Sequence, residues 1–168
     1  MATTPMDLFV TLSGAVCGIA TDKLAPDIDP IDVKQAYFDT AQKQASAAFA
    51  QLLNIVGANA SLPPDRLADL VLNKSGDDIR FLVRSIMLAW YLGSWYQPAD
   101  LAKYAGPNPP ATPIDFFVIS ADAYTQGWVW STAQAHPMGY SDMQFGYWTH
   151  PPQPIIDFIA VRNPKGGG

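Results

Sequence analysis

Two histidines, one serine and one aspartate are the side chains of this sequence that most invite a hydrolytic or metal-binding interpretation. His136 and His150 are the only histidines, and Ser141 and Asp142 lie between them. On paper they could form a Ser-His-Asp triad or a metal site. However, no Gly-x-Ser-x-Gly elbow surrounds the serine, and the histidine spacing fits no helical metal-binding pattern. We interpret both histidines as loop residues, and keep a metal-dependent enzyme using His136 and His150 as an alternative.

The remaining reactive residues favour structural roles. Cys17 is the only cysteine, which rules out an intrachain disulfide and a cysteine-based zinc site. No neighbouring base or basic cluster would lower its pKa, so we expect a small core residue. The adjacent Asp77 and Asp78 suit a helix N-terminus. No glycine-rich nucleotide-binding motif occurs. We therefore expect no catalytic, cofactor-binding or metal-binding residue in this chain.

Composition limits the class of protein. The chain has 168 residues, 49% of them hydrophobic, which is enough for one core, so we expect a single domain over residues 1–168. The net charge is −5, and lysines and arginines are scattered, which argues against nucleic-acid binding. Charged residues interrupt every apolar run before it could span a bilayer. The first lysine is Lys23, so the sequence as given shows no export leader.

Apolar periodicity predicts a mainly α fold, a small helical bundle. Thr4 and Pro5 should begin a first helix that ends near Gly18. Three more helices are expected, over about residues 30–57, 64–75 and 79–91, the last capped by Asp77 or Asp78. The helical core then covers about residues 4–95.

The C-terminal third is predicted to be irregular and rich in proline and aromatic residues. Residues 97–113 look like a surface loop. The stretch "DFFVIS" (115–120) should lead, in extended form, into a helix over about 121–130. The stretch "IIDFIAV" (155–161) is predicted to be a short strand or an arm. Together, residues of about 96–168 form a loop and a C-terminal wrapping segment.

Aromatic residues gather in this second half of the chain, several beside glycine and proline. They either fold back onto the helices or anchor a partner, because aromatic side chains are favoured at interface hot spots. The candidate partner-binding residues are Trp128, Trp130, Tyr140, Phe145, Tyr147, Trp148 and Pro151.

The order of four motifs resembles a known family. They are "FVTLSGAVCG" (9–18), "AWYLG" (89–93), "YTQGWVW" (124–130) and the stretch from Tyr140 to Pro151. In this order they resemble the small subunit of bacterial membrane-bound FAD-dependent sugar and polyol dehydrogenases, such as the sorbitol, fructose and glucose dehydrogenase complexes. The matching pieces extend from about Asp7 to Pro152.

The resemblance implies a non-catalytic subunit. In that family the small subunit binds and stabilises a large subunit, which carries FAD and an iron–sulfur cluster and passes electrons to a multihaem cytochrome c subunit. It also commonly carries a twin-arginine leader, so the resemblance implies a periplasmic, membrane-associated complex and an escort role in export. Ser141 stands where relatives often have a cysteine able to bond to the large subunit, so we expect a non-covalent interface. A freestanding module that binds carbohydrate or protein through the aromatic loop is the alternative.

Overall fold

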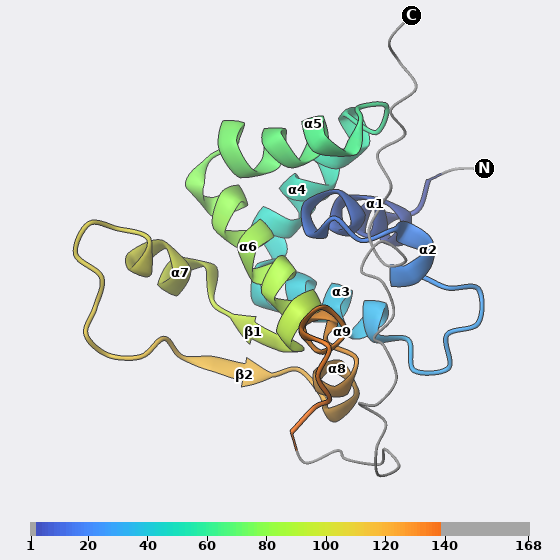
Figure 1. The fold of residues 1–168 in the computed structure, drawn as a ribbon. Coiled ribbons are helices and arrows are strands. Elements are labelled where there is room, and N and C mark those ends of the chain that lie inside the picture. The colour runs from blue at the N-terminus through green and yellow to red at the C-terminus, as the bar shows by residue number, and fades with distance from the viewer. Residues whose placement is uncertain (1–2, 139–168) are drawn as a thin grey trace, which may run out of the picture.

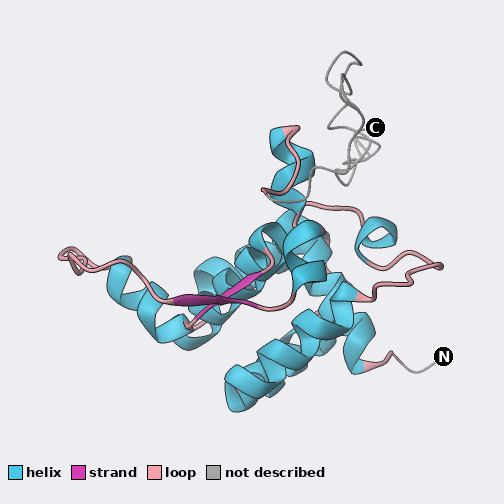
Figure 2. Cartoon of the chain, turned by 90° about the horizontal axis from the view of Figure 1, so that it is seen from below, coloured by secondary structure: helices cyan, strands magenta, loops and turns pink. Residues whose placement is uncertain are grey.

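The computed structural model describes residues 3–138 of the chain and is mainly helical, as the periodicity predicted. Helices surround α6, which contacts α1, α3, α4, α7, α8 and α9 (Figure 1). A two-stranded antiparallel ribbon, β1 and β2, follows α6, and β1 contacts that helix (Figure 2). The elements are α1 (Pro5–Cys17), α2 (Thr21–Leu24), α3 (Val33–Gln44), α4 (Ser46–Ala58), α5 (Pro64–Asp69), the π-helix η1 (Leu70–Lys74), α6 (Asp77–Leu92), β1 (Ser94–Tyr96), α7 (Pro98–Tyr104), β2 (Phe116–Val118), α8 (Ala121–Thr125) and α9 (Trp128–Ala133).

Helix α1 begins and ends where the sequence predicted. The Thr4 hydroxyl accepts a hydrogen bond from the Asp7 amide at 3.1 Å, and the Asp7 carboxylate accepts one from the Thr4 amide at 2.8 Å. This reciprocal capping box satisfies two amides that would otherwise lack partners. The same hydrogen bonds hold the pKa of Asp7 below its usual value. At the other end, Gly18 takes the left-handed conformation with φ of 70°.

The expected helix over 30–57 is instead two helices. The chain turns at Ala45, whose φ and ψ of −146° and 46° leave the helical region. The turn allows Phe38 of α3 and Phe49 of α4 both to pack edge-to-face on Phe9 of α1, with ring centroids 5.6 and 5.9 Å from it. Tertiary aromatic packing therefore overrides a continuous helical pattern. The helix also begins only at Val33, because Asp32 has a positive φ of 52°.

Three further expectations are wrong in detail. Residues 97–113 are not all loop, since Pro98 begins α7. The N-cap of α6 is Gly76, which puts the two expected caps, Asp77 and Asp78, inside the first turn. The helix expected over 121–130 is split into α8 and α9 at Gly127.

A buried polar relay joins α1 to α6 at the centre of the core. The indole N–H of Trp90 donates to the Ser13 hydroxyl at 2.8 Å, and that hydroxyl donates to the Phe9 carbonyl one turn earlier at 2.7 Å. Trp90 is only 1% exposed, so an unpaired N–H here would be costly. A second tryptophan, Trp95 in β1, is equally buried, but its indole N–H has no hydrogen-bond partner among the described residues.

The end of α6 meets α8 at a point where only glycine fits. Gly93 has φ of 63°, and a Cβ at this position would overlap the carbonyl group of Ala123. Nearby, a Cβ on Gly127 would lie 2.8 Å from the Tyr91 carbonyl oxygen. The α8 and α9 helices can therefore lie directly against the C-terminal end of α6, because two side chains are missing from the contact.

The two tryptophans offer a matched test of the relay. Trp90→Phe and Trp95→Phe remove the same atoms from sites of equal burial, but only the first removes a hydrogen bond and leaves the Ser13 hydroxyl without its donor. We expect Trp90→Phe to lower the free energy of unfolding by about 1–2 kcal/mol more than Trp95→Phe does. Urea denaturation of both variants measures the difference. Equal losses would show that the relay contributes nothing to stability.

A second matched pair tests the close approach at the end of α6. Gly93→Ala and Gly18→Ala both place a Cβ at positive φ, which costs about 1 kcal/mol each. Position 18 has open space around it, whereas position 93 meets Ala123. We expect Gly93→Ala to cost a further 1–3 kcal/mol or so through overpacking, visible as a lower midpoint of thermal unfolding. A melting temperature for Gly93→Ala as high as that for Gly18→Ala would contradict this contact.

Candidate partner-binding surface

The structure places two of the seven candidate contact residues and leaves five outside the described part of the chain. Trp128 and Trp130 lie on α9. Outside the described residues are Tyr140, Phe145, Tyr147, Trp148 and Pro151, together with the polar residues Ser141, Asp142 and His150.

Both tryptophans of α9 are half-buried and anchored within the chain. Trp128 packs against the core cluster. The indole N–H of Trp130 donates to the Tyr124 carbonyl at 2.7 Å, and its ring meets the Tyr124 ring edge-to-face with centroids 5.3 Å apart. These contacts fold α9 back against α8. A partner could therefore touch only the outward part of each ring.

An exposed apolar strand, β2, is the surface that the sequence did not predict as a contact site. All three of its side chains are apolar and exposed: Phe116 by 56%, Phe117 by 42% and Val118 by 48%. β2 pairs antiparallel with β1, and the rings of Phe116 and Tyr96 stack with centroids 5.1 Å apart. Consecutive exposed apolar residues on a strand indicate an interaction surface more strongly than single ones do.

A signal for this surface was present in the sequence. The run Phe116-Phe117-Val118 has strand propensity but no alternation between polar and apolar residues. Such a run predicts a strand buried on both faces. In the structure, β1 pairs with one edge of β2, and the side chains on both faces of β2 are exposed. This lack of cover marks the site.

The candidate chemical residues that the structure describes are not assembled into a catalytic arrangement. The Nδ1 atom of His136 lies 3.3 Å from the carbonyl oxygen of its neighbour Pro137. Within residues 3–138, no group of three or more histidine, cysteine or acidic side chains is placed to hold a metal ion. Burial raises the pKa of the Cys17 thiol to about 12, so the thiol is protonated at neutral pH and is a poor nucleophile.

Asp77 and Asp78 are among the residues that line an apolar groove between α4, α6 and α7. The groove has a volume of about 280 Å³, and Phe81, Leu82 and Ala102 are among its lining residues. One carboxylate oxygen of Asp77 accepts a hydrogen bond from Arg80 at 2.8 Å, and both aspartates are exposed. They therefore form no buried carboxylate pair of the kind that would share a proton.

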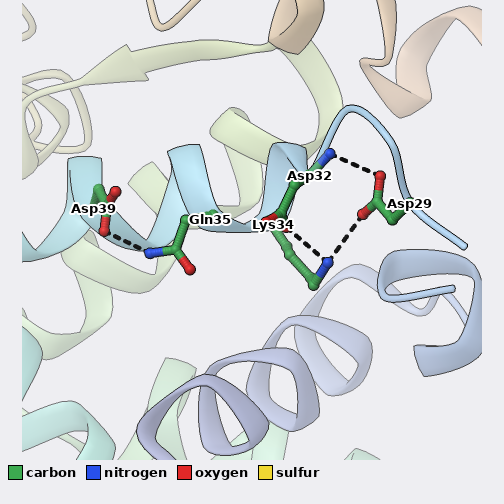
Figure 3. Close-up of polar contacts among 5 residues, drawn as sticks. All are labelled: Asp29, Asp32, Lys34, Gln35 and Asp39. Carbon is green, nitrogen blue, oxygen red and sulfur yellow. Dashed lines mark hydrogen bonds and ion pairs between the residues drawn. The ribbon is translucent and has the colours of Figure 1, made fainter. Parts of the chain in front are cut away.

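A network of charged side chains fixes the loop that precedes α3 (Figure 3). The Lys34 ammonium lies between Asp29 and Asp32, at 3.0 and 2.7 Å, and the second oxygen of Asp29 accepts the Asp32 amide at 2.8 Å. Burial opposes ionisation of Asp29, but the Asp32 amide and the Lys34 ammonium outweigh it and lower the pKa of that carboxyl. The lysine and both aspartates are engaged with one another, so the network is a structural clamp on the loop.

None of the helices among residues 3–138 is both long enough and apolar enough to cross a bilayer. Comparison of the chain with protein-family models, with curated proteins and with solved structures gives no match.

Proposed function

We propose that this chain is a non-catalytic small subunit that binds and stabilises the FAD-containing subunit of a membrane-associated sugar or alcohol dehydrogenase. In this proposal the flavin, iron–sulfur and haem groups belong to the partner subunits, and the complex works in the periplasm. The role of this chain is to fold, to cover part of the flavoprotein and to escort it during export.

The observation that carries the proposal is the uncovered apolar surface of β2, which contacts α8, the helix against which Trp130 of α9 is held. A single domain that buries Phe9, Tyr37 and Trp90 at its centre has no need of further aromatic residues on an exposed strand. Exposed apolar surface of this kind gains free energy when a partner covers it.

The arrangement of the motifs adds support. Three of the four stretches that resemble the dehydrogenase family meet at one place in the fold, the C-terminal half of α6. Ser13 of the first stretch accepts the Trp90 indole N–H of the second. Gly127 of the third stretch approaches the carbonyl of Tyr91. Residues spread over more than half of the chain therefore form one framework, and the fourth stretch, from Tyr140 to Pro151, follows directly after it in the sequence.

Co-expression with the FAD-containing large subunit of a dehydrogenase of the proposed type tests the proposal. We expect a stable complex on size-exclusion chromatography, with an interface of at least about 1,200 Å². Trp148→Ala or Tyr147→Ala should each weaken binding by about 2 kcal/mol, roughly thirtyfold in Kd, because buried aromatic anchors dominate interface energies. Leu62→Ala is the control, since Leu62 is an exposed apolar residue in the turn between α4 and α5.

Two results would overturn the proposal. One is a chain that stays monomeric and indifferent to the flavoprotein under all conditions of mixing. The other is tight binding of simple sugars by the isolated chain, measured by calorimetry without any partner, which would favour a carbohydrate-binding module instead.

A further inference from the structure

The outer edge of β2 offers backbone hydrogen-bonding groups that no described residue uses. The register places Ser94, Trp95 and Tyr96 opposite Val118, Phe117 and Phe116. One step further along, the Ile119 amide donates to the Gly93 carbonyl at 2.9 Å. Bonded and non-bonded pairs alternate in an antiparallel ladder, so the amides and carbonyls of Phe116 and Val118 point away from β1.

Apart from its short length of three residues, this edge lacks the features that usually keep an exposed strand unpaired. β2 contains no charged residue, no proline and no bulge, and its side chains are exposed and apolar. A two-stranded ribbon is stabilised by a packed helix or by a third strand. Here β1 contacts α6, whereas none of the described elements pairs with the outer edge of β2. The edge is therefore built to accept an extended segment.

The chain itself supplies a segment of suitable composition. Thirty residues follow Met138, and within them the stretch 155–161, "IIDFIAV", contains five β-branched or aromatic residues out of seven. Residues 155–162 lie outside the described part of the chain, so only their sequence bears on the pairing. The sixteen residues 139–154 that connect them to Met138 can span up to about 50 Å.

The point where the described chain ends sets the direction of such a pairing. α8 follows β2 after two residues and contacts it, and α9 comes next (Figure 1). A segment that returns from α9 reaches the Val118 end of β2 first and then runs outward toward Phe116. The pairing is therefore antiparallel.

We propose that residues 158–161 add to the free edge of β2 as a third, antiparallel strand, with Ile159 opposite Val118. This register also pairs Phe116 with Val161, so two apolar cross-strand pairs lie side by side on one face of the ribbon and extend that face. The same register places Arg162 opposite Asp115, so that their opposite charges attract. A shift of the strand by one residue would separate this pair.

The added strand has a consequence for the contact loop. Residues 140–151 become a loop closed at both ends, by α9 on one side and by the new strand on the other. Closing a loop lowers the entropy that it loses when it binds a partner. The strand pairing itself involves this chain alone, so it does not depend on the proposed function.

Cysteine cross-linking tests the register. Val118→Cys with Ile159→Cys places two cysteines directly opposite, at the Cα separation of about 5.5 Å that a disulfide accepts. The matched control is Val118→Cys with Ala160→Cys, whose side chains point to opposite faces of the sheet. We expect an intramolecular disulfide in the first variant and none in the second under mild oxidation. The buried native thiol of Cys17 does not compete. Equal cross-linking in both variants, or none in either, overturns the proposed register.

Amide hydrogen exchange on the isolated full chain tests the occupant. The amides of Phe116 and Val118 should exchange at least about tenfold more slowly in the native chain than in the double variant Ile159→Asp and Val161→Asp. The amides of α6 should be unchanged between the two, which shows that the bundle is intact. Protection that rises with protein concentration would assign the edge to a second copy. Protection that requires added flavoprotein would assign it to the partner. Either result overturns the strand pairing. Pairing with a second copy leaves the proposed function untouched, and protection that requires the flavoprotein supports it.

Discussion

The hydrogen bond from the Trp90 indole to the Ser13 hydroxyl is the interaction around which this fold is organised. It lies in the C-terminal half of α6, the helix that the other helices surround, and it fixes the position of α1 along that helix. The Phe9 ring stacks on the Trp90 ring at 6.2 Å, and the Tyr37 ring meets its edge at 4.8 Å. A large aromatic residue with one polar group specifies a unique arrangement, because rotating or sliding α6 would leave a buried N–H unpaired.

The same constraint determines where the second half of the chain lies. Once α6 is fixed, Gly93 turns the chain into β1, and the close contact between Gly93 and Ala123 places α8 beside the end of the helix. The Tyr37 hydroxyl on α3 donates to the Ala123 carbonyl at 3.2 Å, so the bundle holds α8 from a second side. The bundle thereby holds β1, whose Trp95 is buried in the core, and β2 pairs with β1. The side chains of β2, in contrast, are exposed.

Local signals in the sequence predicted the elements that depend on local interactions. The capping box of α1 is formed by Thr4 and Asp7, with Pro5 between them at the first helical position. α6 ends at Gly93, and glycine is a common local stop signal for a helix. The breaks at Ala45 and Gly127 were not predictable in the same way. Neither residue interrupts the apolar period strongly, and each break exists because residues distant in sequence, Phe9 and Tyr91, require it. The ribbon escaped prediction for a related reason: its pairing joins residues about twenty positions apart across a helix and a proline-rich loop.

The candidate contact surface follows from how the aromatic residues are divided between these two parts. Aromatic residues of the first half of the chain, together with Trp90, pack in or against the core, where their rings meet edge-to-face and their polar groups have hydrogen-bond partners. Trp128 and Trp130 are half-buried, because Trp128 packs against the core and Trp130 is held by α8. Phe116 and Phe117 are exposed, and they lie on a strand that pairs with β1 along one edge only. Cover for apolar side chains thus decreases in space, from the bundle through α9 to β2. Because water solvates such side chains poorly, the free energy available from burying them is largest at the ribbon, which is where another segment or another protein gains most by binding.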